Sequence, residues 1–446
     1  MSIIRKNKFL FSFSSYSMKF ARIFDFSLRL LLVFLPFSTL LSVFFGEKLG
    51  IPWVSFLKEW LIFLMLLTLL LEHVRGRLRI IWSRYDLIIG IYIALFIGIS
   101  LFTTGLSGII YWGRYDFAFL ILFFAVFHGY ALLGERLSYY LRLFLIAWGV
   151  ALFCSMLLKW PFSEDILLYF GYSGNPSNWQ FGSAIPIFHG VEGANVRRFQ
   201  WIFDGPNTMG AYLLVYMGIF TYYLRQKKDW YFTIGAILIL FFVCIIYTYS
   251  RSALLGLLGW LFFILVFSAR TLYRHYPGQV IGLSIIGILL VGGVFLQYGG
   301  NLQAIIERGG SSKWHAERMM IGVNKAISHP LWLWLWSEWP AYRYVENLGK
   351  KDRTEIEKLD VKNIPESWYI QQLVEGGILG GILFLVLMGV FFWNLYRSHV
   401  ILAGMFLSIL IMNFFLHTFE SSTVSLSLFA IIGLILASYS SPEKHG

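Results

Sequence analysis

The sequence contains few charged residues and few cysteines. Charged side chains make up 13% of its 446 residues, whereas hydrophobic side chains make up 58%. A soluble domain carries roughly 25% charged residues, so a chain this poor in charge cannot cover a water-facing surface. The two cysteines, Cys154 and Cys244, both lie in apolar runs. We interpret them as small buried hydrophobic residues rather than as a disulfide, a metal site or a nucleophile.

The sequence also lacks the common short motifs of cofactor binding. It contains no P-loop, no dinucleotide fingerprint and no zinc-ligand spacing, and no internal repeat or low-complexity tract. We therefore expect no metal and no other cofactor. The net charge of +12 would suggest nucleic acid on a soluble protein. Here the basic residues gather in short loops between apolar runs, so nucleic acid is not expected as a partner.

Long apolar runs dominate what is present. A spanning helix needs roughly 20 mostly apolar residues, and the 17 Trp and 25 Tyr suit two interfacial belts. The runs predict an all-α integral membrane protein, surrounded by membrane lipids, with about twelve transmembrane helices in a single polytopic domain, residues 1–446. The runs lie at about 27–45, 54–71, 86–104, 115–133, 138–158, 207–224, 229–248, 252–268, 279–297, 368–395, 400–418 and 422–440.

Basic residues in the short connections predict the orientation, because Lys and Arg favour cytoplasmic loops. One set of connections is rich in them, and the other set carries only Lys48, Arg114 and Arg251. The rich set is therefore predicted to be cytoplasmic, as are the N- and C-termini. Its members are Arg75, Arg77, Arg79, Arg84, Arg136, Arg225, Lys227, Lys228, Arg270, Arg274 and Arg397.

Two outer segments are too long to be simple turns. The first covers residues 159–206, and the second, larger one covers residues 298–366 between the predicted helices 9 and 10. Part of the second segment alternates apolar and polar side chains at near-helical spacing, which predicts helices lying on the membrane surface. The apolar positions are Trp314, Met319, Ile321, Val323 and Ile327.

Five arginines are predicted at this outer face: Arg114, Arg197, Arg198, Arg251 and Arg318. Guanidinium groups stay charged and bind phosphate through two parallel hydrogen bonds, so several around one cavity would suit a lipid-linked diphosphate. The alternative is that each is an interfacial anchor, which is common for one Arg at a helix end. Arg251 departs most from that alternative, because its outer connection is short and apolar.

Several predicted outer residues could act as a general base. The candidates are Glu366, His315, His329, Asp204 and Glu420. A Glu that precedes a spanning helix is also explained by the favourable helix dipole, so Glu366 alone is ambiguous. We interpret His128, inside the fourth run, as a hydrogen-bonded core histidine.

Four blocks together resemble the O-antigen ligase and polymerase superfamily, the WaaL and Wzy proteins. The first block is an Arg followed by a Gly-Pro-Asn turn, and the second is a Ser-Arg-Ser-Ala-Leu sequence. The third is an outer-loop Arg followed by an apolar helix and Pro, and the fourth opens the tenth helix. The resemblance spans about residues 110–385. The blocks are residues 198–207, 249–256, 318–330 and 366–380.

This resemblance implies a metal-independent, inverting glycosyltransferase of GT-C-like fold that works in lipopolysaccharide or other polysaccharide biosynthesis. It implies an active site at the periplasmic face of the bacterial inner membrane. The donor would be an undecaprenyl-diphosphate-linked oligosaccharide, and the acceptor glycan would be a lipid-linked repeat or lipid A core. Arg198 and Arg251 match the positions that bind the diphosphate, and Arg318 matches a third. Glu366 or His315 would orient or deprotonate the acceptor hydroxyl.

One departure bears on the acceptor. Ligases of this superfamily have a His, usually followed by Asn, where this chain has Glu366 and Ser367. The departure favours an O-antigen polymerase, with a chain-length regulator as partner, over an O-antigen ligase, which stays an alternative. A second alternative is a lipid-linked sugar transporter or flippase. Transporters usually show repeats and a midplane site, whereas this chain is asymmetric and has few ionisable residues within its apolar runs.

Overall fold

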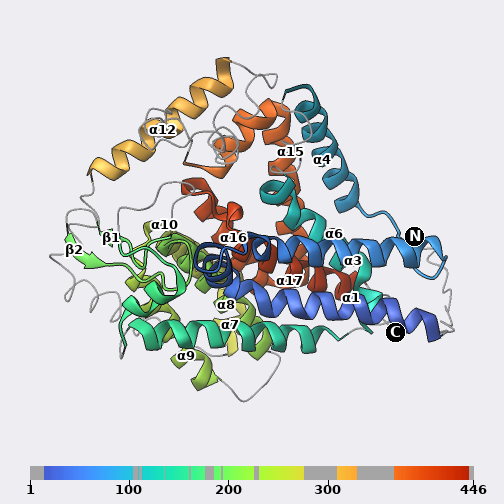
Figure 1. Cartoon of the computed structure of the whole chain (residues 1–446), viewed down its shortest axis with the longest axis horizontal. Coiled ribbons are helices and arrows are strands. Elements are labelled where there is room, and N and C mark those ends of the chain that lie inside the picture. The colour runs from blue at the N-terminus through green and yellow to red at the C-terminus, as the bar shows by residue number, and fades with distance from the viewer. Residues whose placement is uncertain are drawn as a thin grey trace.

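The computed structural model is built mostly of helices (Figure 1). The ninth predicted run, residues 279–297, lies outside the residues that it describes, as does His329. The described residues are 15–103, 109, 113–134, 136–159, 162–175, 185–191, 194–225, 231–275, 309–328 and 366–440.

The helices follow the predicted apolar runs closely, and the expectation of an all-α membrane protein is confirmed in this respect. The α-helices are α1 (Ser15–Phe34), α2 (Ser38–Val43), α3 (Leu57–Val74), α4 (Arg84–Thr103), α6 (Ala118–Gly129), α7 (Leu137–Lys159), α8 (Pro206–Arg225), α9 (Tyr231–Tyr247), α10 (Arg251–His275), α12 (Gly309–Ser328), α15 (Trp368–Ser398), α16 (Val400–Phe415) and α17 (Ser422–Ser440). The short helical turns are η1 (Leu35–Phe37), η2 (Phe44–Lys48), η3 (Pro52–Phe56), η4 (Gly113–Phe117), η5 (Tyr130–Leu133), η6 (Glu164–Phe170) and η8 (Thr418–Glu420).

Seven helical stretches of the described chain are long and apolar enough to cross a membrane. Two further apolar helices, Arg251–Ile264 and Val400–Phe415, are shorter. A total of about twelve spans therefore stays a prediction. The seven stretches are Lys19–Lys48, Pro52–Val74, Arg84–Leu101, Gly113–Leu133, Leu137–Leu157, Trp368–Ser398 and Ser422–Ser440.

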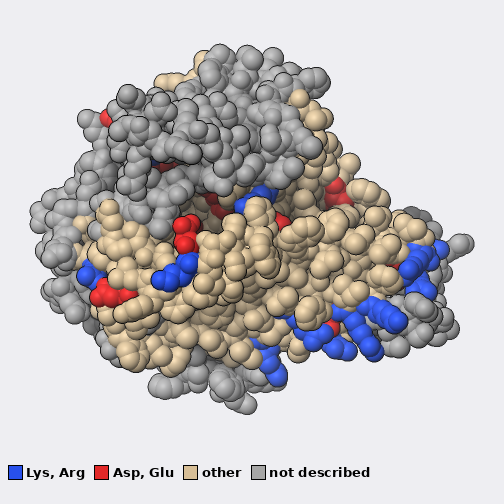
Figure 2. Space-filling model, viewed as in Figure 1, with Lys and Arg blue, Asp and Glu red and all other residues tan. Residues whose placement is uncertain are grey.

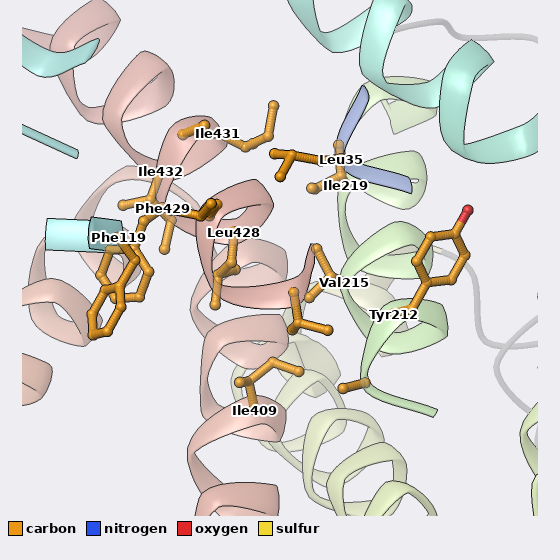
Figure 3. Close-up of a cluster of buried hydrophobic side chains, with 14 of the residues drawn as sticks. Leu35, Phe119, Tyr212, Val215, Ile219, Ile409, Leu428, Phe429, Ile431 and Ile432 are labelled. Atoms are coloured by element: carbon orange, nitrogen blue, oxygen red, sulfur yellow. The ribbon is translucent and has the colours of Figure 1, made fainter. Parts of the chain in front are cut away.

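The centre of the molecule is α17, which is buried along almost its entire length. Its sequence is apolar on every side, as expected for a helix surrounded by other helices. Leu428 and Phe429 are fully buried, and Phe429 packs on Phe119 of α6 with ring centroids 4.6 Å apart (Figure 3). Helices α6 and α8 both contact α17, so α17 is held by helices from separate parts of the chain.

The first apolar run is interrupted near its middle. Pro36 cannot donate a backbone hydrogen bond and disrupts a continuing helix, and here the chain passes through η1 into the short helix α2. The hydroxyl of Ser38 bonds to the Leu35 carbonyl at 2.8 Å and to Thr423 of α17 at 2.9 Å. The interruption therefore brings the polar residues of α2 beside the start of α17.

Basic residues from different predicted cytoplasmic loops lie close together. Arg84, the first residue of α4, and Arg397, at the end of α15, line one hollow with Trp393. Figure 2 shows Lys and Arg gathered at the end of the visible face where the N- and C-termini lie in Figure 1. This clustering is the pattern that the positive-inside rule predicts.

The first outer segment departs from a purely helical fold. Strands β1 (Gly190–Val191) and β2 (Ala194–Arg197) pair antiparallel, with Gly190 opposite Arg197. Strands this short give no hydropathy signal, and they were not predicted from the sequence.

The second outer segment contains the predicted amphipathic helix, now α12. Met319, Val323 and Ala326 pack against Ile370 and Val374 of α15. Ile327 was expected on the apolar face, but its side chain is 70% exposed. Helix α12 is thereby fixed to the start of α15.

Candidate active site

The site begins at the tight turn between α9 and α10. Ser250 caps α10, because its hydroxyl accepts a hydrogen bond from the Ala253 amide at 3.3 Å, the usual role of a Ser at a helix start. Tyr249 has a φ of 50°, which is uncommon for a residue other than glycine. This turn makes Arg251 the first residue of α10 and places its side chain at the predicted outer end of the helix.

Arg198, which precedes this turn by fifty residues in the sequence, is hydrogen-bonded to it. Its Nε donates to the Thr248 carbonyl at 2.9 Å and its Nη2 to Asn207 Oδ1 at 3.1 Å. The next amide, of Phe199, donates to the Tyr247 carbonyl at 2.9 Å. Several bonds therefore fix the Arg198 guanidinium beside Arg251.

A glycine allows α8 and α10 to approach closely enough for this arrangement. A Cβ at Gly210 would lie 2.6 Å from the Cβ of Ala253 and 3.6 Å from that of Ser250. Real Cβ atoms do not come as close as the first of these distances. Any larger residue at Gly210 would therefore move Asn207, at the start of α8, away from Arg251.

These elements enclose a cavity of about 370 Å³. One part of its wall is polar and cationic, and the other part is apolar. Helix α12 and the end of α16 complete it. Its lining consists of Arg198, Asn207, Tyr249, Arg251, Ser252, Leu255, His315, Ala316, Met319, Phe415 and Leu416. We call this the arginine cavity.

His315 is backed by a buried ion pair. Arg318 Nη1 donates to Glu366 Oε1 at 2.7 Å, and Glu366 Oε2 contacts Nδ1 of His315. Arg318 is only 6% exposed, and a buried charge needs such a partner. Glu366 itself does not line the cavity, so it reaches the cavity through His315.

The environment of His315 favours its neutral form. Burial lowers the pKa of its imidazole, and the positive charges of Arg251 and Arg318 lower it further. With Nδ1 against a carboxylate, the ring proton belongs on Nδ1, which leaves the lone pair of Nε2 as an acceptor. The arrangement can therefore orient the imidazole and accept a proton at Nε2.

The structure does not bring all five predicted arginines together. Arg197 is exposed, lies over the ring of Phe188 at 4.2 Å and is 3.9 Å from Glu164, outside the arginine cavity. Arg114 donates to Glu59 at 2.7 Å and lines a second cavity. Arg318 is behind the wall, bonded to Glu366. Arg198 and Arg251 are thus the two that line the arginine cavity.

The other candidate bases have separate environments. Asp204 and Glu420 line the second cavity. His128 Nε2 donates to Asp86 Oδ1 at 3.0 Å, and its side chain is 6% exposed, so the prediction of a hydrogen-bonded core histidine is confirmed. Lys58 also lines the second cavity, and no role for it was predicted from the sequence. The Pro36 interruption followed by Ser and Thr was the available signal for a polar site near the first two helices.

Comparison with known proteins supports the family resemblance. Residues 236–385 match the family model described as O-antigen ligase (Wzy_C). This range contains Arg251, His315, Arg318 and Glu366. No curated protein and no solved structure matches the chain. The resemblance to the O-antigen ligase and polymerase superfamily is confirmed over this range.

Proposed function

We propose that this protein is a glycosyltransferase that moves a glycan from undecaprenyl diphosphate onto an acceptor sugar hydroxyl. We place this activity at the periplasmic face of the bacterial inner membrane, in a GT-C-like fold with both termini in the cytoplasm. The observation that carries the proposal is the arginine cavity, where Arg198, Arg251 and His315 face one space.

The cavity wall matches the two parts of such a lipid. Arg198 and Arg251 supply the positive charge that a diphosphate needs, and guanidinium groups bind phosphate oxygens in pairs. The apolar residues Leu255, Met319 and Phe415 on the other part of the wall suit the first isoprene units. Because backbone carbonyls already hold the guanidinium group of Arg198, this group needs little reorganisation when negative charge develops on the leaving diphosphate.

The proposed reaction uses His315 as general base. The acceptor hydroxyl oxygen forms a bond to C1 of the donor sugar while the bond from C1 to the diphosphate oxygen breaks. The electron pair of that bond leaves with the diphosphate, where Arg198 and Arg251 stabilise it. The hydroxyl proton passes to Nε2 of His315. Attack from the face opposite the leaving group inverts the configuration at C1, and no step requires a metal.

Glu366 acts as a positioning residue in this scheme. Its carboxylate holds the Nδ1 side of His315 and is itself fixed by Arg318. This role replaces the direct proton transfer that the sequence also allowed, because Glu366 lies behind the imidazole relative to the cavity.

The acceptor separates two candidate functions. The Glu366-Ser367 pair favours a polymerase, whose acceptor is a lipid-linked repeat, with a chain-length regulator as partner. The family description, O-antigen ligase, favours lipid A core as acceptor. Gel profiles of cells that lack the protein distinguish them. Loss of a polymerase leaves single-repeat lipopolysaccharide, whereas loss of a ligase leaves bare core and lipid-linked polymer.

Arg251→Ala tests the transferase itself. We expect it to abolish the glycan product in cells, while Arg197→Ala, an exposed arginine outside the cavity, leaves the product unchanged. A normal product distribution in the Arg251→Ala cells, at equal protein level, would contradict the clamp. A loss of lipid-linked sugar from the periplasmic leaflet would instead indicate a flippase.

A further inference from the structure

A second cavity of about 370 Å³ lies beside the first apolar run. Five parts of the chain enclose it: α2 with η2, η3 with the start of α3, η4, the segment before α8, and the start of α17 with the loop that leads into it. Its lining consists of Ser38, Thr39, Ser42, Val43, Gly46, Glu47, Pro52, Ser55, Lys58, Arg114, Tyr115, Ile185, Asp204, Glu420, Ser421, Ser422 and Thr423. We call this the hydroxyl cavity.

Hydroxyl groups predominate in this lining. They come from α2 on one wall and from the start of α17 on the other, and Ser38 and Thr423 join the two walls through their hydrogen bond. A hydroxyl both donates and accepts hydrogen bonds, so such a wall can match the mixed donors and acceptors of another polyhydroxylated molecule. Tyr115 adds an aromatic ring to the lining.

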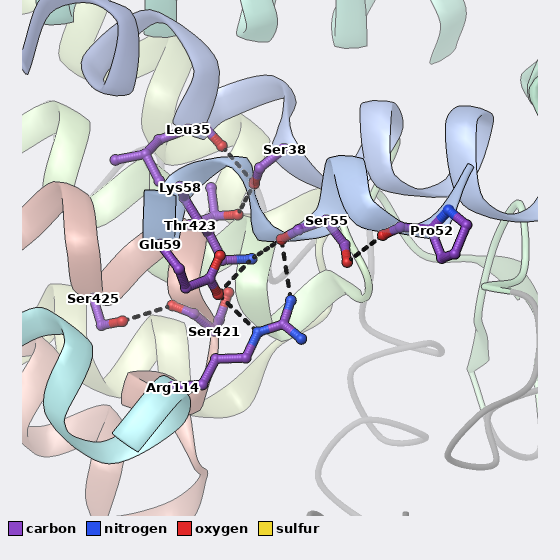
Figure 4. A network of polar contacts seen from close by, with 10 residues as sticks. All are labelled: Leu35, Ser38, Pro52, Ser55, Lys58, Glu59, Arg114, Ser421, Thr423 and Ser425. Atoms are coloured by element: carbon purple, nitrogen blue, oxygen red, sulfur yellow. Dashed lines mark hydrogen bonds and ion pairs between the residues drawn. The ribbon is translucent and has the colours of Figure 1, made fainter. Parts of the chain in front are cut away.

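The cations of this cavity are already paired. Arg114 donates to Glu59 Oε1 at 2.7 Å and to the Ser55 carbonyl at 3.1 Å, and Lys58 lies 3.8 Å from the same carboxylate (Figure 4). The carboxyl groups of Asp204 and Glu420 line the cavity from other parts of the chain. The hydroxyl cavity therefore lacks the unpaired positive charge that would attract a phosphate group.

The two cavities are neighbours along two stretches of chain. Asn207 lines the arginine cavity and Asp204, three residues earlier, lines the hydroxyl cavity. Leu416 lines the first and Glu420, four residues later, lines the second. A molecule whose diphosphate lies between Arg198 and Arg251 therefore needs to extend past only these short segments to reach the hydroxyl cavity.

We propose that the hydroxyl cavity binds pyranose rings of the glycan that is transferred at the arginine cavity. This inference rests on the proposed function. Its volume lies within the range of about 300–1,000 Å³ that small-ligand sites occupy. A cation site is disfavoured, because the described residues contain no cluster of three or more His, Cys, Asp or Glu.

The protonation state of Glu420 agrees with an uncharged ligand. Burial raises the pKa of Glu420 to about 8, and the nearby charge of Asp204 raises it further. Enclosure also raises the pKa of Asp204. At neutral pH, Glu420 is therefore mostly a neutral acid, which can donate one hydrogen bond and accept another from a sugar hydroxyl.

Binding titrations with the full-length protein in lipid nanodiscs test this proposal. The probes are bare undecaprenyl diphosphate and the lipid-linked repeat unit extracted from cells that lack the protein. We expect the wild-type protein to bind the sugar-bearing lipid at least tenfold more tightly than the bare lipid. Ser42→Leu fills the cavity from α2, and Ser421→Leu fills it from the opposite wall. Each should remove that preference and leave the affinity for bare lipid unchanged.

The control is Leu41→Phe, the residue beside Ser42, which lines a separate apolar hollow with Phe34 and Trp53. It should keep the tenfold preference. If both cavity-filling variants also keep the preference, the sugar site is wrong while the proposed transferase stands. If the wild-type protein binds neither lipid, the proposed function itself fails.

A third probe identifies which sugar occupies the cavity. The free repeat unit, released from its lipid by mild acid, resembles the acceptor rather than the donor. If it binds wild-type protein but not Ser42→Leu, the hydroxyl cavity holds the acceptor glycan. If it does not bind wild-type protein and the lipid-linked form does, the cavity holds the donor glycan. Equal binding of the free unit to both proteins would contradict the proposal.

Discussion

At the scale of single residues, Arg197 and Arg198 show how neighbours with the same side chain receive different environments. Arg197 ends strand β2, and successive side chains of an extended chain point in opposite directions. Arg197 therefore lies near Glu164 at the surface, while Arg198 turns toward the α9–α10 turn. The sequence placed both at the outer face but contained no signal to choose between them, because the choice depends on a contact with Thr248.

His315 gives a prediction at this scale. Its pKa lies below the ordinary 6.5, so the imidazole is mostly neutral at pH 6.5. We expect the midpoint of the acid-side fall in transfer rate to lie below pH 6.5. His315→Ala should reduce the rate by about 100-fold or more, the usual contribution of a general base. The measurement is product formation from extracted lipid-linked repeat across pH.

The control is Glu317→Gln, which alters an exposed residue of the same helix and should keep both rate and profile. A midpoint of that fall above pH 6.5, or a His315→Ala enzyme with half the normal rate, would argue against His315 as the base.

Glu420 predicts a pH dependence of sugar binding on the alkaline side, in contrast to the acid-side dependence that His315 predicts for the transfer rate. Its pKa of about 8 means that it gains a negative charge as pH rises through 8. Asp204 faces it, Lys58 and Arg114 line the same cavity, and His417 Nδ1 lies 3.6 Å away, too far for a hydrogen bond. We expect affinity for the sugar-bearing lipid to fall at least threefold between pH 7 and 9. Glu420→Gln should reduce that fall, and an equally steep fall in the variant would refute the assignment.

The same shift affects stability with a definite sign. The folded-state pKa of Glu420 exceeds its ordinary value of 4.5, so the folded state binds more protons than the unfolded state between these two pH values. Stability from this group therefore decreases as pH rises from about 4.5 to 8. Glu420→Gln should be less sensitive to pH in this window.

At the scale of elements, hydropathy located the helices well, because about 20 consecutive apolar residues leave little choice but a spanning or buried helix. Residue-by-residue periodicity also located α12. Periodicity did not locate β1 and β2, which are too short to show a pattern. It also misplaced Ile327, whose exposure depends on how α12 packs on α15. Arg198 and Thr248, which are hydrogen-bonded, are fifty residues apart in the sequence, and no local pattern predicts their contact.

The packing of α8 on α10 provides a prediction for elements. Gly210→Ala places a Cβ 2.6 Å from that of Ala253, and such overpacking typically costs about 1–3 kcal/mol. We expect a lower Tm and a marked loss of transfer, because Asn207 and Arg198 move relative to Arg251. Adding Ala253→Gly should restore both. Gly389→Ala, where the new Cβ meets nothing within 4 Å, is the control. Failure of the second change to restore activity would refute this packing argument.

At the scale of the whole molecule, the arginine cavity and the hydroxyl cavity divide a lipid-linked glycan by its chemistry. One cavity combines guanidinium groups with an apolar wall, and the other combines hydroxyls with carboxyl groups. The sequence predicted the first through its arginines. It did not predict the second, whose lining comes from five separated parts of the chain and becomes visible only when the interrupted first run packs on α17 (Figure 4).

Sidedness is the prediction for the whole molecule. Glu47 and Arg79 are both exposed and are predicted on opposite faces. In a background without Cys154 and Cys244, Glu47→Cys should react with an impermeant maleimide added to cells with a permeabilised outer membrane. Arg79→Cys should react only after the inner membrane is opened. The reverse pattern would place both cavities in the cytoplasm and would exclude a periplasmic transferase.

The central claim is that Arg198 and Arg251 hold a diphosphate between them. Its most direct test is the affinity of bare undecaprenyl diphosphate for the purified protein in nanodiscs. Hydrogen bonds to charged groups contribute about 1.5–3 kcal/mol, and each 1.4 kcal/mol is a factor of ten in Kd. We therefore predict that Arg198→Ala and Arg251→Ala each weaken binding at least tenfold, while Arg197→Ala leaves it within twofold. Equal affinities for all three variants would contradict the account.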